Sequence, residues 1–138
     1  MTPQLEEAAA MLRLADRDIA ALTVLCHSDE IHLSILCFHA QQAIEKCFKA
    51  ALFCHLIEFR RTHDLQRLTD LLSEHGLQAP LTVAQVADLN PCAVLLRYDD
   101  AEIEIENISR TELSQMVTSV RTWAEAVFQG AKSAEANA

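Results

Sequence analysis

The sequence predicts a single all-α domain, and three observations support this fold class. The 138 residues include only two glycines and three prolines, which are too few for the many tight turns of an all-β fold. With 51% hydrophobic residues, a chain of this length can fill one core. Its apolar residues recur every three or four positions, the spacing of an amphipathic helix. We therefore expect one helical domain over residues 1–138, with a frayed tail over about 131–138.

Three helices are predicted in the first half of the chain. The first runs from Leu5 to about Cys26, where small and large apolar residues share one face. The second runs from about Ile31 to Ile57 and is the most apolar segment, so we expect it at the centre of the fold. The third begins at Thr62, the predicted N-cap, with Asp64 in its first turn. Gly76 ends it.

The second half contains two further helical segments. Thr82 is predicted to cap a fourth segment, which Asn90–Pro91 interrupts and restarts. The acidic stretch from Asp99 to Glu106 is predicted to be a loop. Ser109 followed three residues later by Glu112 is typical of a capping box, so the last helix is expected to begin there.

The charge of the chain restricts its partners. It has 20 acidic and 11 basic residues, a formal net charge of −9, which opposes non-specific binding to nucleic acid or to an anionic membrane. The sequence contains no apolar run long enough to span a bilayer, and its N-terminus is acidic, so we expect a cytoplasmic protein with no membrane partner.

The motifs of several catalytic classes are missing from the sequence. Its five cysteines are odd in number and lie mostly in apolar stretches, as expected of reduced core residues. Neither paired Cys/His spacing, a glycine-rich phosphate loop nor a GxSxG elbow is present. We therefore expect neither a metal nor a cofactor.

One face of the second helix carries a polar ridge, formed by Gln42, Glu45, Lys46 and Lys49. These four residues fall within one arc of the helix, and the rest of the helix is apolar. Two interpretations are open. The ridge is either a solvent-exposed face with ordinary pairs at four-residue spacing, or the helix is buried and the ridge lines a groove or interface where its lysines bind an anion such as phosphate.

Two other polar clusters are candidates for binding. Arg60–Arg61 and His63 surround a predicted helix start, and guanidinium groups beside free backbone N–H groups favour an anion. The alternative is a plain cap with a locally bonded histidine. Arg97 and Tyr98 form the second cluster, suited to an acidic partner within the fold or to the phosphate and base of a ligand.

Four segments together resemble one known family. They are FHAQQAIEK at 38–46, KAAL at 49–52, RTHDL at 61–65 and LRYD at 96–99. Their order and content resemble the HEPN domain (higher eukaryotes and prokaryotes nucleotide-binding), over nearly the whole chain. The family pattern often has proline where this chain has Asp99.

The resemblance implies an up-and-down bundle of four to five helices, often dimeric. Stand-alone prokaryotic members are commonly encoded beside a minimal nucleotidyltransferase, in two-component systems that include toxin–antitoxin pairs. The resemblance therefore implies a homodimer, a nucleotidyltransferase partner and a nucleotide ligand such as ATP or GTP. Carried over by position, the binding residues are Gln42, Glu45, Lys46, Lys49, Arg61, His63, Asp64, Arg97 and Tyr98.

Roles within this set are hypotheses at this point. Lys46, Lys49 and Arg97 would meet phosphate charge, and Tyr98 would stack on a base or sugar. Asp64 would either orient His63 or cap the helix.

Some family members are metal-independent endoribonucleases with an arginine followed, after four to six residues, by a histidine. That spacing is absent, since Arg17 precedes His27 by ten positions and Arg67 precedes His75 by eight. The sequence therefore favours a binding module over an enzyme. The alternative is a ribonuclease toxin with an atypical catalytic set, namely His63, Arg97 and Tyr98.

Overall fold

The computed structural model describes residues 1–97 and 108–138, and every regular element in these ranges is a helix. The elements are α1 (Pro3–Leu25), α2 (Leu33–Cys54), α3 (Leu65–Glu74), α4 (Val83–Leu89), the short 3₁₀ helix η1 (Asn90–Arg97) and α5 (Arg110–Ala136). The predicted all-α helical bundle is confirmed. The predicted acidic loop over residues 99–106 falls outside the described residues.

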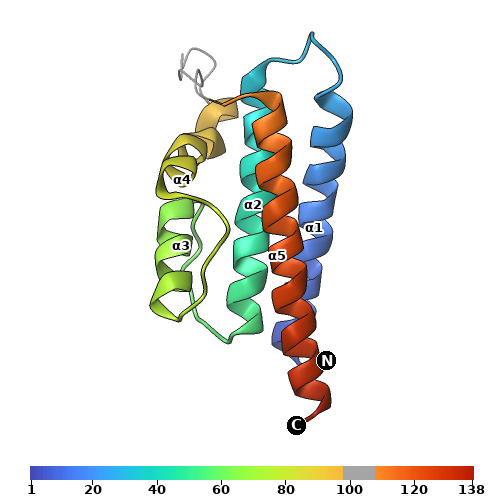
Figure 1. Ribbon diagram of the computed structural model, residues 1–138, viewed down its shortest axis with the longest axis vertical. Coiled ribbons are helices and arrows are strands. Elements are labelled where there is room, and N and C mark those ends of the chain that lie inside the picture. Colours follow the sequence, from blue (N-terminus) through green and yellow to red (C-terminus); the bar gives the residue numbers. More distant parts are fainter. Residues whose placement is uncertain (98–107) are drawn as a thin grey trace.

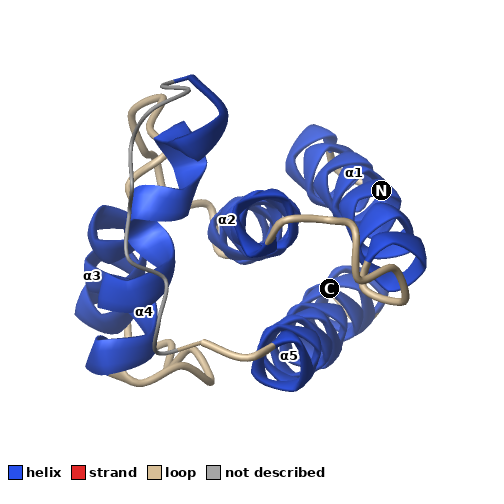
Figure 2. Cartoon of the chain, turned by 90° about the horizontal axis from the view of Figure 1, so that it is seen from above, coloured by secondary structure: helices blue, strands red, loops and turns tan. Residues whose placement is uncertain are grey.

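Helix α2 is the central element, as its apolar composition predicts. Seen from above, α2 lies between the pair α1 and α5 on one side and α3 with α4 on the other (Figure 2). Helices α1, α2 and α5 are the long members, and α3 and α4 form a shorter layer beside α2 (Figure 1). Helix α2 contacts each of the other helices, so its apolar residues are buried on several faces at once.

The side chains at the helix starts agree with the sequence at two positions and differ at a third. Ser109 forms the predicted capping box with Glu112, and Thr82 is the predicted cap of α4, where it forms a capping box with Gln85 as well. Thr62 is not the cap of α3, because the cap is Asp64, whose carboxylate accepts from the backbone N–H groups of the first turn. The Thr62 hydroxyl instead accepts a hydrogen bond from the Asp64 N–H at 3.0 Å.

The ends of two long helices differ from the sequence prediction. Helix α2 stops at Cys54, short of Ile57, because Leu56 adopts a left-handed backbone conformation with φ 56°. Helix α5 continues through Gly130 to Ala136, where fraying was expected. In this last part Ala131 packs against the core, and the Met1 amino group forms an ion pair with Glu135 at 3.6 Å.

The core is apolar and contains three of the five cysteines. Phe48 of α2 meets Trp123 of α5 edge to face, which joins the two helices at mid-height. All five cysteines are free thiols, as the sequence predicts. Burial raises the pKa of the Cys47 thiol to about 12 and that of Cys54 to about 11. None of the described helices is both long and apolar enough to cross a bilayer.

Candidate functional site

The predicted polar ridge of α2 is buried at its centre. Glu45 is only 3% exposed, which rules out the solvent-face interpretation for this residue. Its carboxylate accepts from Lys49 Nζ at 3.1 Å and from His63 Nδ1 at 2.9 Å. Because a buried carboxylate is costly without partners, these contacts are what allow Glu45 to lie inside the fold.

Gln41 is a part of this cluster that the sequence did not single out. Its side-chain N–H₂ group donates to Glu45 Oε1 at 3.3 Å and to the His63 carbonyl at 3.2 Å. Its own oxygen accepts from Gln42 Nε2 at 2.6 Å. Gln41 therefore ties the α2–α3 connector to α2 through the main chain. The available signal was an amide on an otherwise apolar face, four residues before Glu45.

His63 borders a hollow in the surface and contacts Glu45 through one ring nitrogen. A carboxylate only accepts hydrogen bonds, so the contact with Glu45 places the proton of a neutral imidazole on Nδ1 and leaves Nε2 as an acceptor. The side chain is 50% exposed. It borders a cavity of about 600 Å³, which we call the His63 hollow and which is lined by His63, Asp64, Gln66, Ala87, Asn90, Pro91 and Ala93.

Asp64 has a structural role at this site. Its Oδ1 accepts from the N–H groups of Gln66 and Arg67 and from Asn90 Nδ2 at 2.8 Å. Asn90 in turn accepts from the Leu65 N–H at 2.8 Å. Of the two roles open to Asp64, the structure therefore shows capping, and Glu45 is the residue that contacts the His63 ring. The sequence indicates Asn90 only as the residue before Pro91 in the interrupted fourth segment.

The structure separates Lys46 from the rest of the ridge. Lys46 Nζ pairs with Asp18 of α1, and His39 Nδ1 contacts the same carboxylate at 3.2 Å. Lys46 therefore faces α1 while Lys49 faces Glu45. Both ridge lysines already have carboxylate partners, so neither is an unpaired cation awaiting phosphate.

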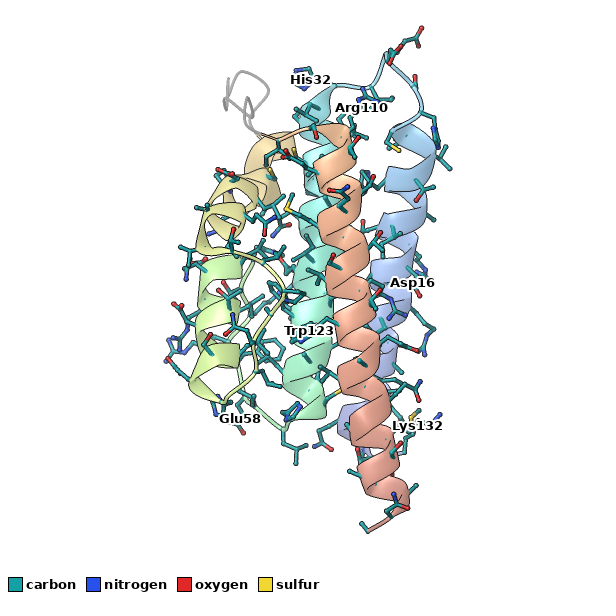
Figure 3. All side chains as sticks on the ribbon, in the orientation of Figure 1. Asp16, His32, Glu58, Arg110, Trp123 and Lys132 are labelled. Carbon is teal, nitrogen blue, oxygen red and sulfur yellow. The ribbon has the colours of Figure 1, made fainter. Side chains whose placement is uncertain are left out.

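The α2–α3 connector carries a second hollow, of about 560 Å³, which we call the arginine hollow. Arg61 lines it together with Glu58, Phe59, Arg60, Thr62, Arg67 and Leu71. Figure 3 labels Glu58 where the connector passes the lower end of α3. Thr62 of this lining and His63 of the other hollow are neighbours in sequence.

Two predicted site residues lie at or beyond the edge of the described chain. Arg97 is the last residue of η1, and Tyr98 lies outside the described residues. Within residues 1–97 and 108–138, no group of three or more His, Cys, Asp or Glu side chains is arranged to hold a metal ion.

Comparison with protein families identifies the family of this chain. The family model of the HEPN domain matches residues 8–129, which span α1 to most of α5. Neither the curated proteins nor the solved structures include a match to this chain.

Proposed function

This chain belongs to the HEPN domain family, and we propose that it works as a helical nucleotide-binding module with a nucleotide such as ATP or GTP as its ligand. The observation that supports this proposal most directly is the fixed imidazole of His63. Buried Glu45 and Gln41 hold the ring and main chain of this residue, and its side chain is half exposed.

The His63 hollow suits a small ligand. Its volume of about 600 Å³ falls within the roughly 300–1,000 Å³ typical of small-molecule sites. Its wall combines the imidazole and the Gln66 amide with apolar surface from Ala87, Pro91 and Ala93. A base or ribose offers donors and acceptors for the polar groups and flat apolar area for the rest.

Calorimetric titration with ATP and with GTP tests this function. We expect binding to the wild type and at least about tenfold weaker binding to His63→Ala, the equivalent of roughly 1.4 kcal/mol. His27→Ala is the matched control, because His27 is exposed in the α1–α2 loop. Absence of binding to the wild type at millimolar nucleotide would refute the proposal. An equal loss of affinity in His63→Ala and His27→Ala would show that the nucleotide does not bind at His63.

We further propose that the protein acts as a homodimer with a minimal nucleotidyltransferase partner, as in a toxin–antitoxin pair. Two features support this proposal. Stand-alone members of the family occur beside such enzymes, and a net charge of −9 favours a protein partner over bulk nucleic acid. Co-expression with the product of the neighbouring reading frame, followed by size-exclusion chromatography with light scattering, checks both parts. A monomer that elutes apart from that product would contradict them.

A second candidate function is metal-independent RNA cleavage, favoured by the Glu45–His63 pair. A carboxylate on Nδ1 prepares Nε2 to act as a general base. Nε2 would take the proton of a ribose 2′-hydroxyl, whose oxygen attacks the adjacent phosphorus. A 2′,3′-cyclic phosphate forms, and the released 5′-oxygen takes a proton from solvent. Arg97 and Tyr98 are the other members of the set inferred from sequence.

Incubation of bulk RNA with purified protein in EDTA distinguishes the two candidates. Cleavage by the wild type that is lost in His63→Ala and kept in His27→Ala would establish the ribonuclease. RNA that stays intact with the wild type would leave the binding module as the function.

A further inference from the structure

The arginine hollow concentrates positive charge on an acidic protein. Three of its seven lining residues are arginines, and they reach it from two elements, with Arg60 and Arg61 on the connector and Arg67 on α3. Glu58 is the single acidic residue of the lining. The local balance is therefore positive, although the chain as a whole carries a net charge of −9.

The three arginines of this hollow form no ion pair within the described residues, in contrast to Lys46, Lys49 and Arg121. Lys46, Lys49 and Arg121 all form ion pairs with carboxylates, and Arg110 donates to three backbone carbonyls. Over residues 1–97 and 108–138, no ion pair involves Arg60, Arg61 or Arg67. Within the described residues, no carboxylate therefore pairs with these guanidinium groups.

The other groups of the lining complete a binding surface. The Thr62 oxygen accepts from the Asp64 N–H, so its hydroxyl proton is free to be donated to a ligand. Phe59 is held by an edge-to-face contact with Phe53 and, with Leu71, supplies apolar wall. A cavity of about 560 Å³ has the volume of a small-molecule site.

We propose that the arginine hollow binds the polyphosphate group of a nucleoside triphosphate. Guanidinium groups match phosphate oxygens with two parallel N–H bonds, and a linear triphosphate presents enough oxygens for three such groups. The convergence of the arginines on one hollow favours this compact anion over an acidic protein segment, which would need a longer basic track. The proposal rests on the proposed nucleotide-binding function and gives it a phosphate site separate from His63.

Titration of inorganic tripolyphosphate into the whole protein tests this site directly. We expect the wild type to bind it and Arg67→Gln and Arg60→Gln each to weaken binding by about tenfold, as for loss of a charge-assisted hydrogen bond. Arg17→Gln is the matched control, since Arg17 is exposed on α1 and the substitution removes the same charge. Circular dichroism melting confirms that each variant is folded, which we expect because these side chains are exposed.

The outcomes separate this proposal from the proposed function. If the wild type binds ATP or GTP, and Arg60→Gln and Arg67→Gln bind the nucleotide with the same affinity, the proposal for the arginine hollow is overturned. Nucleotide binding itself would stand. Tripolyphosphate that binds while neither ATP nor GTP displaces it would overturn the proposal for this hollow, and the direct titration with ATP and GTP would still decide nucleotide binding. A glutamate-rich peptide that displaces tripolyphosphate at lower concentration than ATP would overturn the phosphate proposal in favour of an acidic protein segment.

Discussion

Glu45 shows how one residue gives this protein its central polar cluster. Its carboxylate is buried, and it accepts hydrogen bonds from Gln41, Lys49 and His63. In the described part of the chain, no buried side-chain nitrogen or oxygen lacks a partner. Removal of this acceptor would leave the buried Gln41 amide and the largely buried Lys49 ammonium without their carboxylate partner.

We predict that Glu45→Ala lowers the free energy of unfolding by about 2 kcal/mol, since the buried Gln41 amide and the largely buried Lys49 ammonium lose their acceptor. Urea denaturation followed by circular dichroism measures the change. Glu74→Ala, at the exposed end of α3, is the control and should stay within about 0.5 kcal/mol of wild type. Equal effects of the two substitutions would show that the Glu45 contacts contribute nothing to stability.

The raised pKa of Cys54, about 11, predicts an unusual pH dependence of its alkylation. The thiolate is the reactive form, so the rate with iodoacetamide should rise about tenfold per pH unit from pH 8 to pH 10. In the urea-unfolded chain, where the pKa returns to about 8.5, the rate should level off above pH 9. Peptide mapping by mass spectrometry separates Cys54 from the other cysteines, and a plateau at pH 9 in the folded protein would contradict the burial effect.

At the scale of elements, local sequence signals located the helices well. Three-to-four periodicity placed α1, α2 and α3, and the Thr82 and Ser109 signals placed two helix starts to the residue. Each of these signals involves atoms a few positions apart. The cap of α3 is harder to predict, because Asp64 is also held by Asn90, a residue 26 positions away.

We predict that Asp64→Ala costs about 1–2 kcal/mol of unfolding free energy, the usual range for loss of an N-cap. Thr62→Ala should cost less, because its hydroxyl accepts a single exposed backbone hydrogen bond. Thermal and urea unfolding of the two variants rank the positions. If Thr62→Ala proved the more damaging, Thr62 would be the cap after all.

The contacts of the candidate site were harder to predict than the fold, because they join residues that are far apart in the sequence. Glu45, Lys49 and His63 were found from residue type and family pattern, yet their mutual contact depends on how the connector packs on α2. The pairing of Lys46 with Asp18 spans 28 positions, and nothing in the local pattern of α2 shows which lysine turns toward α1. Gln41 was missed because its role depends on a backbone carbonyl of the connector.

At the scale of the whole molecule, Arg110 joins the start of α5 to the α1–α2 loop. Its guanidinium donates to the carbonyl oxygens of Cys26, Ser28 and Ile31, at 2.7 to 2.9 Å. In Figure 3, Arg110 lies beside this loop at the upper end of the bundle. Lower down, Arg121 contacts both Asp16 of α1 and Glu125, so α5 is fixed to the first half of the chain at two heights.

We predict that Arg110→Lys lowers the unfolding free energy by about 1–2 kcal/mol, because an ammonium group cannot reach three carbonyls arranged for a planar fork. Hydrogen exchange of the backbone amides over residues 26–32 should speed up at the same time. Arg13→Lys, exposed on α1, is the control and should change neither quantity. Unchanged exchange in Arg110→Lys would mean that the loop is held by other contacts.

The central place of α2 has a consequence for how this sequence tolerates change. Helices α1 and α5 each keep a side open to solvent, whereas α2 meets α1, α3, α4, η1 and α5, and twelve of its 22 residues are buried. At most positions of α2, a substitution therefore disturbs the packing of that side chain against a neighbouring helix. In a saturation mutagenesis library selected for folded protein, accepted substitutions should be frequent on α1 and α5 and rare along α2. By the same argument, α2 should be the segment whose sequence changes least among distant relatives.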